Sequence, residues 1–394
     1  MLNRRILRVK AFQNLYAYDQ CKASNLNLAK DLIRDAFQPD LNSMEVQDKN
    51  LLKKEAAIAT DLFVSNLNNE FLDMKDFTQP KIKQAVKEAL NFYRQANTKD
   101  YDFLIKNMVS SAERLPQLYL YAIKLILAFG EHVAGETERK RKFSGEKVTM
   151  TVGEMNLAKN VVLDKIRQSK EFEAACTRNQ VDLEELELEI KEWFRDYIRP
   201  LDEYKAYIGL SAPTAEQDFE ITDDILKKVI FQNDVILNFF SEKDMNWTEN
   251  KSVVRSLASK VLKNVKSHLD ETGEVLPEIA LNWEEDKEFF QNIFNLTIQN
   301  DDRNREMIAK KTENWDIERI AQTDKIILSM ALTEMQNFPS IPVKVSINEY
   351  IDISKTYSTP KSKQFVNGLL DVLSKELTDK GLIRKSGRGL LDNK

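Results

Sequence analysis

Apolar residues recur every three or four positions along most of the chain, the spacing that places them on one face of an α-helix. Two stretches near the C-terminus show it most clearly, one with Val343, Ile347, Tyr350, Ile351 and Ser354 and the next with Phe365, Leu369, Val372 and Leu373. Glycine and proline number only 10 and 9, so few residues would interrupt long helices. The pattern predicts an all-α protein.

Earlier in the chain the same period predicts a helix over 3–19, a second over Leu26–Phe37 and a third over Leu51–Leu72. The stretch Leu115–Phe129 is the most apolar segment. It contains one lysine and is short for a membrane span, so we expect a buried core helix. No run of about 18 apolar residues is present, which argues against a membrane protein. Gly368 lies inside the last predicted helix, where we expect it to admit a close neighbour.

Residues 130–153 are predicted to form the clearest internal break. They contain four of the ten glycines, the basic run Arg139–Lys142 and the strand-like run Val148–Val152. The basic run could touch nucleic acid, but a solvated connector is the commoner role of such a loop. Residues 219–270 align with 286–335 on apolar positions and on one Asn-Trp pair, which suggests a degenerate internal repeat.

Charge divides the chain. The formal net charge is −5, yet residues 1–22 carry +4, residues 315–394 carry +2, and the stretch between them carries −11. The basic ends are where an electrostatic footprint for RNA is expected. The acidic middle is better suited to a protein partner. Cys21 and Cys176 are far apart and form no metal or redox motif, so a reducing, cytoplasmic environment is the default.

Three segments together carry a resemblance to a known family. They are Arg4–Tyr16 at the start, Glu318–Met335, and the stretch 341–373, which contains the words IPVKVSINEYIDISKTYST and SKQFVNGLLDVL. In this order they resemble the NusB family of bacterial transcription antitermination factors. The resemblance implies an all-α, NusB-like helical bundle enlarged by an inserted helical region. It places a NusB-like first helix at 1–22, the insertion at 23–285, NusB-like C-terminal helices at 286–377 and a flexible tail at 378–394.

The resemblance also implies a function. Family members bind the boxA element of ribosomal RNA leader transcripts together with NusE, a ribosomal protein, and the RNA polymerase antitermination complex. The positions that match their RNA-contacting residues are Arg4, Arg5, Arg8, Tyr16 and Lys325. Arginine forks and an aromatic ring suit this task, because unpaired bases stack on both. Asp324 and Asp371 match positions that face the protein partner.

Three positions depart from the family pattern: Ser329 and Val372 stand where the family often has a basic residue, and Ser358 stands where it has a turn glycine. The loss of basic groups could weaken RNA contact, so a second reading stays open, in which the chain is a helical protein-binding scaffold that keeps the NusB core without binding RNA. His132 and His268 have no metal-ligand or nucleophile partner at a useful spacing, and no phosphate loop or catalytic motif is present. We therefore expect neither a cofactor nor an enzyme.

Overall fold

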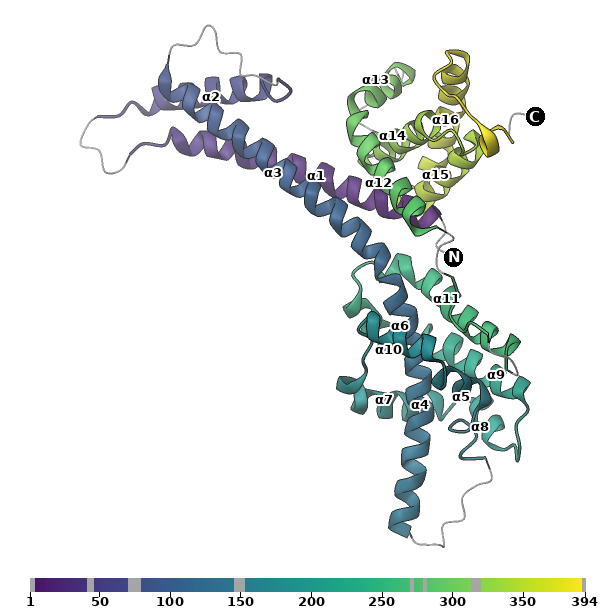
Figure 1. Cartoon of the computed structure of the whole chain (residues 1–394). Helices are drawn as coiled ribbons and strands as arrows, with labels where there is room; N and C mark the ends of the chain where they lie inside the picture. The colour runs from purple at the N-terminus through teal and green to yellow at the C-terminus, as the bar shows by residue number, and fades with distance from the viewer. Residues whose placement is uncertain are drawn as a thin grey trace. The chain divides into compact units, whose positions relative to one another are not determined.

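The computed structural model describes residues 4–40, 46–69, 79–144, 153–269, 273–278, 282–312 and 320–391. Within these ranges every regular element is a helix and none is a strand, which confirms the all-α class (Figure 1). The strand-like run at 148–152 lies outside the described residues.

The chain divides into two compact units. We call residues 1–7 and 110–286 the acidic unit, and residues 8–109 and 287–394 the terminal unit. Each unit is therefore assembled from segments that are far apart in the sequence. The stretch 110–286 contains 24 Lys and Arg against 34 Asp and Glu, a net charge of −10, so the remaining residues carry +5.

The acidic unit is built around α4. Its helices are α4 (Leu115–Ser144), α5 (Val161–Arg167), α6 (Lys170–Arg178), α7 (Glu187–Trp193), α8 (Asp202–Ile208), α9 (Ala215–Asp224), α10 (Asp234–Lys243) and α11 (Trp247–Ser267). Two π-helical turns, Phe194–Ile198 and Ile225–Ile230, continue α7 and α9. Helix α4 packs mainly on α11 and α7. Stacked rings fill part of the core, with Phe240 and Trp247 4.6 Å apart between centroids.

The stretch Leu115–Phe129 is a core helix, as its composition predicts, and Leu115, Leu118 and Phe129 are fully buried. The break expected at 130 is wrong, because α4 continues through Gly130 to Ser144. A Cβ on Gly130 would lie 3.2 Å from the Leu163 side chain and 3.3 Å from the Leu157 carbonyl oxygen. This glycine therefore permits close packing inside a helix and does not end one.

The terminal unit contains the remaining helices. They are α1 (Arg4–Ala36), α2 (Lys49–Ser65), α3 (Pro80–Glu113), α12 (Trp283–Gln299), α13 (Asp301–Lys311), α14 (Gln322–Asn337), α15 (Val343–Tyr357) and α16 (Ser362–Asp379), with the first residues of α1 and α12 and the last of α3 counted in the acidic unit. Helices α14, α15 and α16 pack on one another. The C-terminal part of α1, helix α2 and the N-terminal part of α3 share a core of their own, which includes Ile33, Phe63 and Val86.

Helix α1 is a single helix of 33 residues, so the two helices predicted over 3–19 and Leu26–Phe37 are one. The intervening residues include no proline or glycine, and nothing there stops the helix. The repeat proposed for 219–270 and 286–335 stays a prediction, because Asn314 and Trp315 lie outside the described residues.

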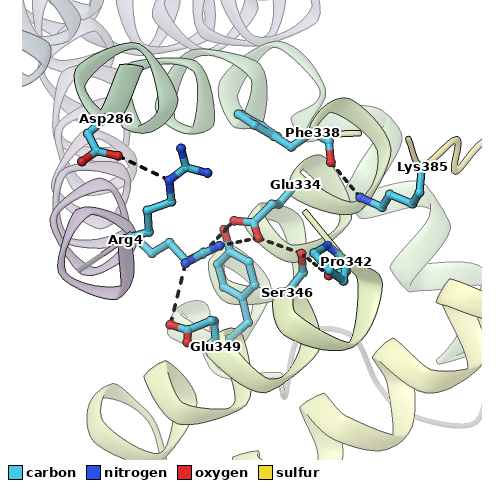
Figure 2. Close-up of polar contacts among 10 residues, drawn as sticks. Arg4, Asp286, Glu334, Phe338, Pro342, Ser346, Glu349 and Lys385 are labelled. Carbon is cyan, nitrogen blue, oxygen red and sulfur yellow. Dashed lines mark hydrogen bonds and ion pairs between the residues drawn. The ribbon is translucent and has the colours of Figure 1, made fainter. Parts of the chain in front are cut away.

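The C-terminal tail, expected to be flexible, packs against the connection between α14 and α15. The Ser386 N–H donates to the Pro339 carbonyl at 3.0 Å, and Ile383 is buried. The Lys385 ammonium donates to the Phe338 carbonyl at 2.9 Å (Figure 2). Residues 383–391 are therefore part of the folded unit.

One helical stretch among the described residues, Pro80–Arg139, is long and apolar enough by composition to cross a membrane. Two thirds of its most apolar window, 67%, is buried inside the protein. The core helix of a globular protein has the same character, so the finding is weak support for a membrane span.

Candidate functional site

A buried ion pair fixes α1 in the terminal unit. The Arg8 guanidinium donates to both carboxylate oxygens of Glu334 on α14, with Nε–Oε2 and Nη2–Oε1 distances of 2.7 and 2.8 Å. The two side chains are 3% and 0% exposed. Glu334 also accepts from the Ser346 hydroxyl at 2.7 Å and the Tyr350 hydroxyl at 3.0 Å, both on α15 (Figure 2). One carboxylate therefore ties together three helices.

The pKa values in this cluster follow from its burial. Burial alone lowers the pKa of Arg8, but the charge and hydrogen bonds of Glu334 outweigh it and raise the pKa above its ordinary value. Burial, followed by the nearby Glu334 charge, raises the pKa of Tyr350 well above its ordinary value. Arg8 is thus permanently charged and Tyr350 permanently protonated, which keeps the network of donors around Glu334 complete.

The other residues predicted on α1 lie in different environments. Arg4 pairs with Glu285 at 2.6 Å and with Asp286 at 3.3 Å, and its side chain is 35% exposed. Arg5 is half-buried, and Tyr16 is 38% exposed. Arg5 belongs to the acidic unit and Tyr16 to the terminal unit. Arg8 is buried.

A groove of about 970 Å³ opens between the end of α13, the start of α14 and α16. Its walls include Asp324, Phe365, Gly368 and Val372. The last of these is 51% exposed. A Cβ placed on Gly368 would meet no atom within 4 Å, so the close neighbour expected there is not supplied by the described part of the chain. The groove is therefore open along the glycine.

Asp324 is the buried carboxylate that lines this groove. It is 4% exposed, and its Oδ2 accepts from the Ser362 hydroxyl at 2.7 Å. Its Oδ1 is buried and has no hydrogen-bond partner among the described residues. Most buried polar atoms are paired, so this unpaired carboxylate oxygen is an exception in the groove wall. No cluster of metal-ligating side chains occurs in the described ranges.

The other predicted residues are near the groove or on α14. Lys325 is half-buried, beside Asp324 in the first turn of α14. Asp371 is exposed on α16, next to the groove residue Val372, and its Oδ2 lies 3.5 Å from the Asn367 amide nitrogen. Asp324 therefore lines the groove, whereas Asp371 does not.

Ser329 and Ser358, two of the positions that depart from the family pattern, both form hydrogen bonds within the terminal unit. Ser329 is 2% exposed, and its hydroxyl accepts from the Asn304 amide at 3.0 Å. The Ser358 hydroxyl contacts those of Thr323 at 2.8 Å and Ser362 at 3.0 Å, in a hydroxyl chain that leads to Asp324. A larger side chain at 329 would have to displace this buried contact. Ser358 belongs to the support of the groove.

Comparison with known proteins gives the family. A model of the NusB family matches residues 250–375, which run from α11 into α16. The transcription antitermination protein NusB of Chloroherpeton thalassium is 41% identical over 143 residues, which cover 35% of this chain and 68% of that protein. The chain belongs to the NusB family. No solved structure gives a significant match.

Two further NusB family relatives agree. The transcription antitermination protein NusB of Salinibacter ruber is 43% identical over 105 residues, 27% of this chain and 66% of its own length. That of Bacillus subtilis is 37% identical over 100 residues, 25% of this chain and 76% of its own. The family match includes Asp324, Lys325, Glu334 and Asp371 but not α1. A family match does not assign contacts to single residues, so the contacts predicted for Arg4, Arg5, Arg8, Tyr16, Asp324, Lys325 and Asp371 all stay predictions.

The sequence did not reveal Glu334, Ser346 or Lys385 as functional residues. Glu334 is fully buried in α14, where Met330 and Leu332 are buried as well. An acidic residue inside an apolar stripe implies a buried partner, and this was the available signal. The identity of that partner, 326 residues away in the sequence, could come only from the structure.

Proposed function

We propose that this chain is a transcription antitermination factor that binds boxA-like RNA of ribosomal RNA leader transcripts, together with NusE and RNA polymerase. Its relatives are named transcription antitermination proteins, and the helices that they share with it build the groove at Asp324. That groove is the observation that carries the proposal.

NusE occupies the groove in this proposal. Phe365, Leu369 and Val372 offer an apolar wall, and Gly368 lets a partner backbone approach closely. A donor from NusE could reach Oδ1 of Asp324 only if the groove wall opened on binding, and it would then satisfy an acceptor whose lack of a partner costs about 1–3 kcal/mol. An acceptor that is unpaired in the free chain and paired in the complex makes the free energy of binding more favourable.

RNA contacts fall to the exposed side of α1 and to Lys325. Tyr16 can stack an unpaired base, worth about 1–3 kcal/mol, and Arg5 can bind phosphate or stack. Arg8 acts by fixing α1 against α14 and α15, because its guanidinium is buried on Glu334. Arg4 forms ion pairs with Glu285 and Asp286, and these carboxylates weaken its attraction for a phosphate.

The engaged arginines also support the second candidate, a NusB-like scaffold that binds proteins without RNA. Arg8 is buried on Glu334 and Arg4 pairs with Glu285 and Asp286, so both side chains are committed within the chain. In that second candidate the groove at Asp324 still binds a protein partner, but the chain does not bind RNA.

A fluorescence-anisotropy titration of a boxA-like RNA separates the two candidates. The full chain is titrated with and without NusE at low and high salt. The antitermination proposal predicts that the chain binds the RNA in a salt-sensitive manner and that NusE tightens this binding. Tyr16→Ala should weaken binding about tenfold, whereas Leu28→Ala, a matched exposed residue on α1, should leave it unchanged. No binding under any condition would exclude the RNA-binding proposal and favour the scaffold.

A further inference from the structure

The acidic unit contains a second large cavity, of about 870 Å³. Its walls come from α4, from the end of α5, from α6 and from the stretch that begins at Val181 and continues into α7. It lies entirely within the acidic unit, whereas the Asp324 groove lies within the terminal unit. The proposed antitermination function uses none of its residues.

The floor of this cavity is apolar. Phe172, Cys176, Val181, Leu183 and Ile190 are all buried side chains that line it. Burial raises the pKa of the Cys176 thiol to about 11, so this cysteine is a small apolar wall residue and not a nucleophile. Such a floor favours apolar side chains of a ligand.

The rim is acidic. Glu131, Glu173, Asp182, Glu184 and Glu187 line the cavity and are exposed. Among the described residues Glu187 pairs with Lys191 at 2.6 Å, and Glu131 lies 3.9 Å from Arg167. The carboxylates of Glu173, Asp182 and Glu184 form no ion pair there, which leaves three negative charges at the mouth.

The lining cations cancel only part of these charges. Lys124 donates to the Val181 carbonyl at 2.7 Å, and Arg167 is paired with Asp164 as well as near Glu131. Lys124 keeps its positive charge, and Arg139 forms no ion pair among the described residues, so these two cations offset two of the three carboxylates and one negative charge remains. Burial lowers the pKa of His132, so its half-buried ring is neutral at pH 7. A surplus of negative charge remains around an apolar floor.

We propose that this cavity is a docking site for a basic, amphipathic helical segment of a partner protein. Leucine-like side chains would fill the floor, and lysine or arginine would pair with Glu173, Asp182 and Glu184. Charge complementarity decides the occupant, because the rim is acidic and the surrounding stretch 110–286 carries −10. RNA is disfavoured here, since its phosphates would meet the same carboxylates.

Gly135 provides a variant that closes the site without harming the fold. It lies inside α4 and lines the cavity, and a Cβ there would have only the Arg139 guanidinium nearby, at 3.9 Å. Gly135→Phe should therefore fill the cavity, and replacing glycine in a helix interior favours the helix. Loss of binding with unchanged or increased stability would show that the cavity itself binds.

The test uses the full chain and two fluorescein-labelled peptides. One is a Leu/Lys amphipathic helix of about 18 residues, or five turns, and the other is its Leu/Glu counterpart. Glu173→Lys with Glu184→Lys reverses the rim. Glu220→Lys with Glu242→Lys makes the same change in net charge on exposed positions that do not line the cavity. A benzoylphenylalanine in the Leu/Lys peptide reports the site by cross-linking.

The proposal predicts saturable binding of the Leu/Lys peptide, no binding of the Leu/Glu peptide, and cross-links to α4, α6 or α7. Gly135→Phe and the rim reversal should each weaken binding about tenfold or more, and the distant reversal should change it less than about twofold. Equal weakening by both reversals would mean non-specific attraction to an acidic protein and would overturn the proposal. Failure of the Leu/Lys peptide to bind, or cross-links elsewhere, would overturn it as well.

Discussion

The two units bury carboxylates in different ways. In the terminal unit Glu334 is neutralised by Arg8, which lies 326 residues away in the sequence. In the acidic unit Asp218, 4% exposed, accepts from the Tyr207 hydroxyl at 2.5 Å and from the Val161 backbone N–H at 2.8 Å. Those donors are 11 and 57 residues away. One site joins opposite ends of the chain, and the other joins residues within the stretch 161–218 of the acidic unit.

This difference explains what each carboxylate holds in place. Loss of the Arg8 interaction leaves a full charge buried without a counter-ion, which costs more than loss of one neutral donor. Glu334 therefore controls the attachment of α1 to α14 and α15, on which the proposed RNA surface depends. Asp218 joins α9 to the start of α5 and to Tyr207, and its loss should be confined to the acidic unit.

The largest expected effect is that of Arg8→Ala. It leaves Glu334 buried and unpaired, so the free energy of unfolding should fall by about 3–5 kcal/mol. Chemical denaturation measures the change. Arg34→Ala on the same helix, where the side chain is 70% exposed, should cost less than about 0.5 kcal/mol. Equal costs for the two variants would show that the buried pair does not hold α1.

Tyr207→Phe should have an intermediate effect. It removes the hydroxyl that donates to Asp218 but leaves the Val161 N–H in place, so we expect a loss of about 1–3 kcal/mol. Denaturation of the full chain, monitored by hydrogen exchange, should localise the loss to the acidic unit. Tyr16→Phe, at an exposed ring, is the matched control and should be neutral. A loss that spreads into α14 and α15 would contradict the local account.

Gly368→Ala and Gly130→Ala should change stability in opposite directions. The first adds a methyl group to open space within α16 and should stabilise the chain by about 1 kcal/mol. The second places its Cβ at 3.2 Å from Leu163 and 3.3 Å from a carbonyl oxygen, so it should destabilise α4. Thermal unfolding compares the two, and the same sign for both would contradict this packing.

The last prediction concerns the docked tail. Burial lowers the pKa of Lys385 from 10.5 to about 8. Between these values the unfolded chain binds more protons than the folded chain, so stability should rise with pH from about 8 to 10.5. Lys385→Met should remove this contribution, so the wild-type chain gains stability relative to the variant over that range. Parallel pH profiles of the two proteins would mean that Lys385 is not buried.

The local pattern predicted the helices but not their ends. The apolar period identified the core helix at Leu115–Phe129 and the helices that became α15 and α16. It failed at Gly130 because a glycine that permits close packing and a glycine that ends a helix look alike in sequence. It failed between 19 and 26 because only tertiary contacts show that α1 continues.

The candidate site could be predicted only in part. Asp324 was found through the resemblance, and its unpaired oxygen could not be foreseen. Arg8 was identified as important, yet its burial on Glu334 depends on a contact between opposite ends of the chain. Helical period alone cannot separate a solvated arginine from a buried one, since the partner is not encoded nearby. Acidic residues of the rim beside α6 stand close together in the sequence at 182–187, but only the structure shows that they surround a cavity.

The central claim is that NusE binds the Asp324 groove, and isothermal titration of NusE into the full chain tests it most directly. Val372 lines the groove and is 51% exposed, whereas Val345 on α15 is 41% exposed and does not line it. We predict that the wild-type chain binds NusE, that Val372→Asp weakens binding at least about tenfold, and that Val345→Asp binds like the wild type. Absence of binding by the wild-type chain, or equal affinities for the two variants, would contradict the account.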